Sequence, residues 1–168
     1  MVRIGLLVLC AWLMTGAGKA PANDWVVRED GFGPVKVGMN LAQLNNILHE
    51  KFAVPADNDD QGCFYVKPEK FPHVSFMIED GRFTRVDVDA AGTGTASGIQ
   101  VGDTEDQARK VYGAKLMVGK AYYTDGHYLT LRSNDGQYAI RFETTKEGKI
   151  ETFYAGKYDA VQYVEGCS

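Results

Sequence analysis

Residues that enzymes commonly use for catalysis are scarce in this sequence. Only three histidines occur among 168 residues, and His49, His73 and His127 stand far apart, with no neighbour that would make one of them a base or a metal ligand. The motifs of serine hydrolases, zinc proteases, phosphate-binding loops and dinucleotide-binding folds are also absent. We therefore predict a protein that is not an enzyme and that has no cofactor and no metal site.

A hydrophobic run long enough to cross a membrane as a helix is missing as well. The longest one, Ile4 to Met14, follows Arg3 and precedes a group of small residues that ends at Ala20 to Ala22. A basic start, a short apolar stretch and a small-residue cleavage site are typical of an export signal. We predict that residues 1–22 are a signal peptide and that the mature chain is periplasmic or secreted, without a transmembrane segment.

Cys10 raises the alternative of a lipid anchor. Leu7 stands three positions before it, as a lipoprotein signal requires, but the residue directly before a lipidated cysteine is normally small and here it is Leu9. Apolar residues also continue beyond Cys10. Anchoring through this cysteine is therefore the less favoured reading.

Basic residues are not in excess. The 18 lysines and arginines are outnumbered by 22 aspartates and glutamates, and without Arg3 and Lys19 of the signal peptide the net charge is −6. Nucleic-acid binding favours a basic surface, so we expect no nucleic-acid partner. A moderate negative charge is ordinary for a soluble protein and defines no function by itself.

Cysteine is rare, and only Cys63 and Cys167 remain after the signal peptide. An even number of cysteines in an exported chain favours a disulfide. Two free thiols or a metal pair is the less favoured alternative, because no histidine or further cysteine stands at ligand spacing. The predicted bond closes a loop of about 104 residues and would stabilise the fold by up to about 4.7 kcal/mol through the entropy of the unfolded chain.

One short pattern is present twice. Val37 to Asn40 and Val101 to Thr104 lie 64 positions apart, and each has a glycine that permits a turn, then a residue that can cap a helix. A glutamine three residues after each cap, Gln43 and Gln107, completes a capping box, and apolar residues follow at helical spacing. The pattern predicts two helices that begin at equivalent places.

After each expected helix the apolar residues alternate with a period of two, which predicts strands at 63–66, 74–79, 83–88, 128–132, 137–143 and 150–155. We therefore predict an α+β protein of two tandem repeats, 23–94 and 95–168, each a capped helix followed by an antiparallel meander of three or four strands. Each repeat is small for an independent core, so the two are expected to share a core or a continuous sheet.

The segment Gly33 to Met39 reads Gly-x-Val-x-Val-Gly-Met. The expected layout is a turn of this kind, a capped helix and a meander, and it occurs twice in a chain with an export signal. This layout resembles that of the beta-lactamase inhibitory protein and of related envelope lipoproteins of the outer-membrane assembly machine. The runs from Gly126 to Thr144 and from Tyr163 to Cys167 are similar to a group of uncharacterised proteobacterial secreted proteins. The inhibitor has a disulfide in each half, whereas one is expected here, so binding of beta-lactamase is not carried over.

Alternation assigns the two faces of the expected strands. Val74, Phe76 and Ile78, like Tyr138, Ile140 and Phe142, would face the core, and Ser75, Met77, Arg141 and Glu143 would face away. Tyrosine and arginine on an open sheet face suit recognition, because both give a large contact area with a polar tip. The candidate binding residues are Tyr128, Thr130, Arg132 and Arg141. An ordinary polar face held by cross-strand pairs is the alternative.

A second candidate surface is the acidic loop that contains Asp57, Asp59 and Asp60. Its first residues resemble a calcium loop, but Gln61 replaces the acid of the fifth position and Pro68 stands where a glutamate would be needed. We expect a solvated loop that could contact a partner and binds no metal.

The sequence thus predicts a non-catalytic exported protein that binds an envelope or extracellular protein through its sheet face, as an inhibitor or an assembly factor does. The alternative is a carbohydrate-binding or peptidoglycan-binding protein that uses exposed tyrosines, and a hydrolase of unrecognised type comes third.

Overall fold

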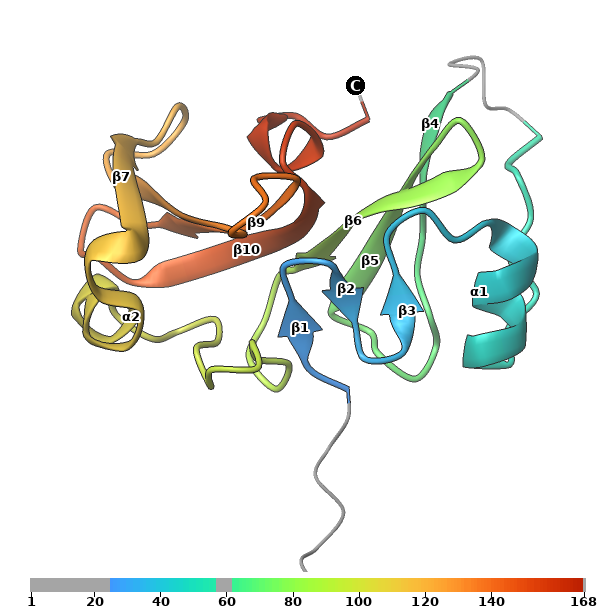
Figure 1. The fold of residues 1–168 in the computed structure, drawn as a ribbon, viewed down its shortest axis with the longest axis horizontal. Coiled ribbons are helices and arrows are strands. Elements are labelled where there is room, and N and C mark those ends of the chain that lie inside the picture. The colour runs from blue at the N-terminus through green and yellow to red at the C-terminus, as the bar shows by residue number, and fades with distance from the viewer. Residues whose placement is uncertain (1–24, 57–61, 168) are drawn as a thin grey trace, which may run out of the picture.

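The computed structural model describes residues 25–56 and 62–167 (Figure 1). Three features expected from the sequence lie outside these residues. They are the signal peptide of residues 1–22, Cys10, and the acidic cluster of Asp57, Asp59 and Asp60.

The strands of the described residues form two antiparallel sheets. The smaller sheet has the order β1-β2-β3 and consists of β1 (Val27–Arg28), β2 (Gly31–Phe32) and β3 (Val35–Lys36). The larger sheet has seven strands in the order β4-β5-β6-β10-β9-β8-β7. Its strands are β4 (Cys63–Val66), β5 (Val74–Glu79), β6 (Arg82–Val88), β7 (Leu116–Lys120), β8 (His127–Arg132), β9 (Tyr138–Thr144) and β10 (Ile150–Lys157).

Two helices of eight residues, α1 (Leu41–Leu48) and α2 (Glu105–Tyr112), begin where the capping boxes predict. The Gln43 amide N–H donates to the Asn40 side chain at 3.0 Å, and the Gln107 N–H donates to Thr104 Oγ1 at 3.2 Å. Both glutamine side chains accept the backbone N–H of their cap in return. The short 3-10 helices η1 (Gly113–Lys115) and η2 (Ala160–Gln162) complete the elements.

The turn before each helix requires glycine. Gly38 and Gly102 have φ values of 92° and 94°, a region that other residues rarely adopt. Their N–H groups donate to the carbonyls of Phe83 and Ile150, each at 2.8 Å. The local similarity of the two segments is therefore confirmed.

The predicted fold class, an α+β protein of two tandem helix-and-meander repeats, is wrong. Residues 25–56 and 62–167 are mostly β, with one sheet of three strands and one of seven, and their helices are short. β6 pairs with β10, Ala155 lying opposite Val86, so the strands on both sides of residue 95 belong to one sheet. Two separate meanders would have two more open sheet edges than one continuous sheet. The pairing of β6 with β10 removes these edges. The residues before the first helix, for which no strands were predicted, form the small sheet. The expectation of a continuous sheet is confirmed.

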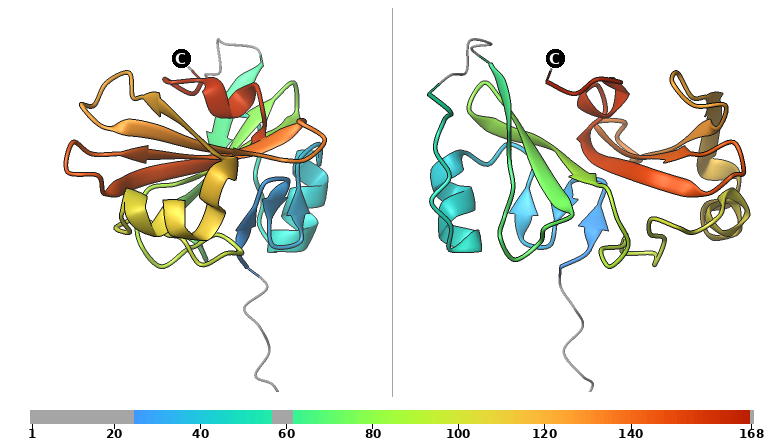
Figure 2. Two further views of the ribbon diagram at one scale, coloured as in Figure 1. Left: turned by 60° about the vertical axis from the view of Figure 1, so that its left-hand side comes forward. Right: turned by 180° about the vertical axis from the view of Figure 1, so that it is seen from behind.

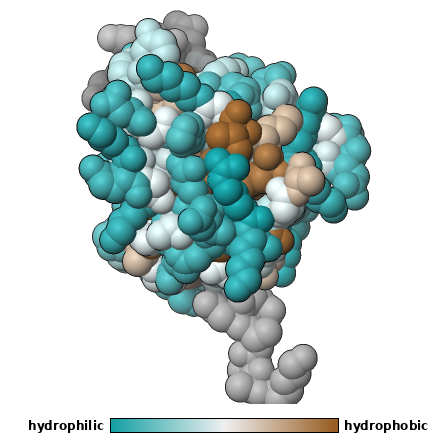
Figure 3. Space-filling model, turned by 90° about the vertical axis from the view of Figure 1, so that its left-hand side faces the viewer, coloured by the Kyte–Doolittle hydropathy of each residue, from teal (hydrophilic) through white to brown (hydrophobic). Residues whose placement is uncertain are grey.

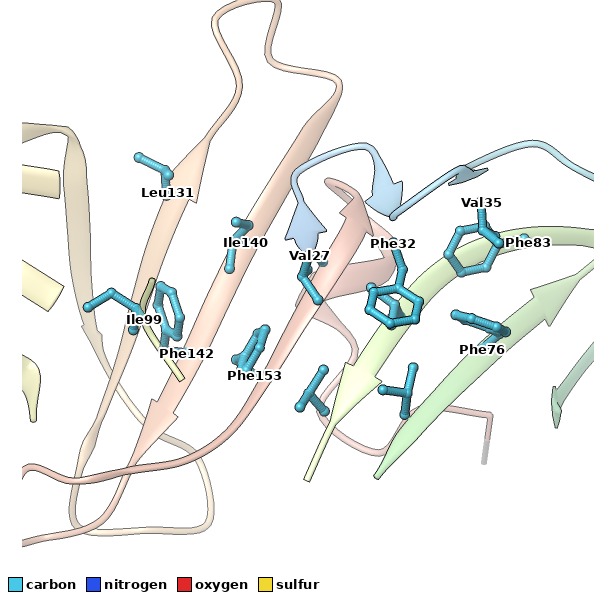
Figure 4. Close-up of a cluster of buried hydrophobic side chains, with 14 of the residues drawn as sticks. Val27, Phe32, Val35, Phe76, Phe83, Ile99, Leu131, Ile140, Phe142 and Phe153 are labelled. Atoms are coloured by element: carbon cyan, nitrogen blue, oxygen red, sulfur yellow. The ribbon is translucent and has the colours of Figure 1, made fainter. Parts of the chain in front are cut away.

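One face of the large sheet packs on the core, and α1, α2 and the small sheet cover it (Figures 1 and 2). Val27 and Phe32 point from the small sheet toward the side chains of the large sheet (Figure 4). The ring of Phe32 lies 6.1 Å from that of Phe76, which lies 5.1 Å from that of Phe83. Burying each such ring contributes about 1.5 to 3 kcal/mol. Of the six residues predicted to face the core, five are buried, whereas Tyr138 is half-buried.

The other face of the large sheet is crossed by the C-terminal segment, residues 158–167, which contains η2 (Figure 2). The disulfide between Cys63 and Cys167 is present, as predicted, and fixes the end of this segment to β4. Met77 was expected on an open face but is fully buried. It lies opposite Tyr65 and Arg85 in the ladder, and their side chains, with the segment above them, shield it from water.

Candidate functional site

The face that the helices leave uncovered carries tyrosines and arginines from five strands, β4, β6, β8, β9 and β10. We divide it into two parts. The closed half contains Tyr65, Arg85, Asp87 and Tyr154, beside the C-terminal segment. The open half contains Tyr128, Thr130, Arg141 and Tyr158, beside β7. The division rests on position, since Arg85 bonds to the C-terminal segment, whereas Tyr128 and Arg141 line a groove beside β7.

Arg85 is the centre of the closed half and is only 3% exposed. Its guanidinium donates two hydrogen bonds to the Asp87 carboxylate, at 2.6 and 2.7 Å, and one to the Tyr65 hydroxyl at 2.8 Å. The same group donates to the carbonyls of Ala160 and Tyr163 at 2.9 and 3.0 Å. These last two bonds hold the C-terminal segment against the sheet.

Burial sets the protonation of this half. Burial lowers the pKa of Arg85, but the hydrogen bond and the charge of Asp87 outweigh it, so the pKa lies above its ordinary value. Burial, with Asp87 adding to it, raises the pKa of Tyr65, and burial with Glu143 raises that of Tyr154. Both tyrosines are therefore protonated at neutral pH, and each donates to its carboxylate. The closed half is a satisfied structural network.

In the open half, Arg141 stacks on an aromatic ring. Its guanidinium carbon lies 4.6 Å from the centre of the Tyr128 ring, and its Nε donates to Thr130 Oγ1 at 3.2 Å. A further nitrogen donates to Gln162 of the C-terminal segment. Burial lowers the pKa of Arg141, which nonetheless remains a cation at neutral pH. Such stacking of arginine on tyrosine contributes about 0.5 to 2 kcal/mol.

The structure brings the four predicted sheet-face residues onto one face, but not into equivalent positions. Thr130 is only 5% exposed because Arg141 covers it, which corrects the expectation of an open side chain. Arg132 is exposed and stacks on Tyr158 instead, its guanidinium carbon 3.9 Å from the centre of that ring. The accessible pair is therefore Tyr128 with Arg141.

A groove of about 230 Å³ lies between this pair and the edge of the sheet. It is lined by Met117, Val118, Gly119, Tyr128, Thr130, Arg141 and Tyr158. Sequence reasoning missed Tyr158, which directly follows β10, and the three residues of β7. The run Leu116 to Val118 after the second helix is the signal that could have indicated a strand there.

The edge strand β7 is unusually open. Met117 is 48% and Val118 44% exposed, and Tyr122 and Tyr123, which follow the strand, are 73% and 62% exposed. The two tyrosine rings are 4.7 Å apart in a T-shaped contact, and a hydrogen bond to Glu165 raises the pKa of Tyr123 to about 12. A hydrophobic patch rimmed by polar residues is visible on this side of the molecule (Figure 3).

A larger groove, about 490 Å³, lies on the other side of the sheet between α2 and β8. Glu29, Lys115 and Arg132 line it together with Tyr112, so it mixes charges of both signs. Most of its lining residues are polar or charged, and its aliphatic ones are Val111 and Leu131. We therefore take the smaller groove, where exposed apolar side chains meet a stacked arginine, as the candidate site.

Two of the three histidines lie beside a carboxylate. His73 lies 3.1 Å from Asp89, and His127 lies 2.7 Å from Glu105. Within residues 25–56 and 62–167, no group of three histidine, cysteine, aspartate or glutamate side chains is placed to hold a metal ion. In the same residues no helix is long and apolar enough to cross a membrane.

Comparison of the chain with models of protein families, with curated proteins and with solved structures found no match. The resemblance to the beta-lactamase inhibitory protein and to the outer-membrane assembly lipoproteins therefore stays a prediction.

Proposed function

We propose that this is a non-catalytic protein, exported to the periplasm or beyond, that binds an envelope or extracellular protein through the open half of its sheet face. The observation that carries the proposal is the groove in which exposed Met117, on the same face of the sheet as Thr130 and Tyr128, lies beside the Arg141–Tyr128 stack. Arginine, tyrosine and methionine are the residues that protein interfaces favour. The identity of the partner will decide whether this protein acts as an inhibitor or as an assembly factor.

The two edges of the large sheet support a role for this end of the molecule. Along β4, side chains are buried or half-buried, whereas four of the five residues of β7 are exposed. An exposed apolar edge strand promotes aggregation, and proteins usually cover or charge such an edge. A partner that covers β7 would account for its apolar surface.

Affinity capture from the native envelope, followed by mass spectrometry, identifies the partner. The double variant Tyr128→Ala with Arg141→Ala should then bind the purified partner at least about tenfold more weakly, because the stack is removed. Arg82→Ala is the matched control: Arg82 is an exposed arginine of β6, outside the open half, and its replacement should leave affinity within about twofold. Wild-type affinity in a folded double variant would refute the proposal.

A carbohydrate or peptidoglycan ligand is the second candidate, favoured by the exposed T-shaped pair of Tyr122 and Tyr123 next to Tyr128. Saturable binding to purified glycan that is lost in Tyr128→Ala would support it. Capture of a single protein whose binding is unchanged by added glycan would support a protein partner.

A further inference from the structure

The last strand of the large sheet has hydrogen-bonding groups that point away from the sheet. Ala121 N–H donates to the Gly126 carbonyl at 3.1 Å, which fixes the alternation of the β7–β8 ladder. Residues of an antiparallel pair alternate between bonding to their partner and pointing outward. Met117 and Gly119 therefore bond to β8, whereas the N–H and C=O groups of Val118 and Lys120 point outward.

The surface along this edge has an apolar centre and cationic ends. Met117 and Val118 are half exposed, and at Gly119 no atom lies within 4 Å of where a Cβ would stand. Lys115 and Lys120, both exposed, flank this centre, and no acidic residue lies between them. Both charged residues of the stretch 115–120 are therefore cations.

We propose that β7 receives an extended segment of the partner protein as an eighth strand, and that this segment has apolar residues at alternate positions and acidic residues at its ends. The inference rests on the proposed function and specifies how that site binds. Main-chain hydrogen bonds supply affinity in such strand addition, and alternate side chains supply specificity. Side chains of the added segment that lie on the same face as Met117 extend over the groove beside Tyr128. The acidic residues at the ends of that segment complement Lys115 and Lys120.

A second copy of this chain fits the edge less well. Two-fold antiparallel pairing centred on Val118 sets Lys120 of one copy opposite Leu116 of the other, next to its Lys115. Lys115 and Lys120 of the two copies then lie close together at both ends of the paired strands. Like charges across paired strands destabilise the pairing. The charge pattern therefore selects an acidic-ended partner.

The test uses the mature chain and two synthetic peptides, Glu-Val-Thr-Val-Thr-Val-Glu and the same peptide with lysine at both ends. Binding is followed by NMR through the backbone amides of Val118 and Lys120. We expect the glutamate-ended peptide to bind at least about tenfold more tightly than the lysine-ended one, with an affinity that falls as salt is added.

Val118→Pro removes an outward N–H without removing a ladder bond, so it should fold and weaken peptide binding at least about tenfold. Val118→Thr keeps the N–H and should bind within about threefold of wild type. Failure of the glutamate-ended peptide to bind, or equal binding to Val118→Pro, would overturn strand addition. A dimer that forms without peptide and that Val118→Pro abolishes would also overturn it, in favour of a second copy.

Binding of the variants to the captured envelope protein distinguishes failure of this inference from failure of the proposed function. Strand addition fails alone if Val118→Pro binds that protein normally while the Tyr128→Ala, Arg141→Ala variant does not. Both proposals fail if neither change affects its binding.

Discussion

Replacing Arg85 by methionine should cost about 3 kcal/mol of folding free energy. The side chain is 3% exposed and makes five hydrogen bonds, to Asp87, Tyr65 and the carbonyls of Ala160 and Tyr163. Methionine fills much of the volume but leaves a carboxylate and two carbonyls without their donor. Removing one member of a buried ion pair costs about 3 to 5 kcal/mol. We take the lower end because the Asp87 side chain is 19% exposed and water can reach it.

Urea denaturation of the wild type and of Arg85→Met measures this difference. The matched control is Arg132→Met, the same chemical change at an exposed arginine that also stacks on a tyrosine, where a loss of about 1 kcal/mol or less is expected. Hydrogen exchange should show that the amides of residues 158–167 lose protection in Arg85→Met, because the segment loses two of its anchors.

Equal losses in the two arginine variants would contradict this account of the closed half. So would unchanged protection of the C-terminal segment in Arg85→Met. Either result would mean that the disulfide alone holds the segment and that the network under it contributes little.

Three more predictions concern stability. Asn40→Ala and Thr104→Ala should each lower the free energy of unfolding by about 1 kcal/mol in urea, since each helix loses a capping acceptor; unchanged midpoints would refute the caps. Joint replacement of Cys63 and Cys167 by alanine should lower it by up to about 4.7 kcal/mol, and the intact wild type should show alkylated thiols only after reduction. Burial raises the pKa of Glu105, but hydrogen bonds from His127, Thr144 and Arg109 outweigh it, so the folded-state pKa is depressed. Its contribution is therefore present above the unfolded pKa of about 4.5 and lost as pH falls through the lower folded value. Glu105→Gln should be less stable than wild type at pH 7, and the difference should shrink in acid; a constant difference would contradict the assignment.

Local features of the structure could be predicted from the sequence because local rules determine them. The strands at 63–66 and 74–79 have the predicted bounds, since alternation and flanking turn residues define them. Both helices start after their predicted caps. Cys63 and Cys167 are paired, as expected from an even number of cysteines in a chain predicted to be exported.

Non-local features could not be predicted. The pairing of β6 with β10 joins residues that are far apart, and no local pattern encodes it. Met77 is buried because the C-terminal segment returns across the sheet, and Thr130 because Arg141 folds over it. The groove could not be predicted either, because Tyr158 lines it and the position of Tyr158 depends on the same order of strands. Alternation assigns a side chain to a face but does not tell what lies on that face.

The central claim is that the open half binds a protein while the closed half is structural. Hydrogen–deuterium exchange of the chain with and without its captured partner tests it most directly. The account predicts that binding increases protection in β7 and β8 and leaves residues 159–167 unchanged. Protection confined to the C-terminal segment or to the first three strands of the large sheet, with β7 unaffected, would contradict it.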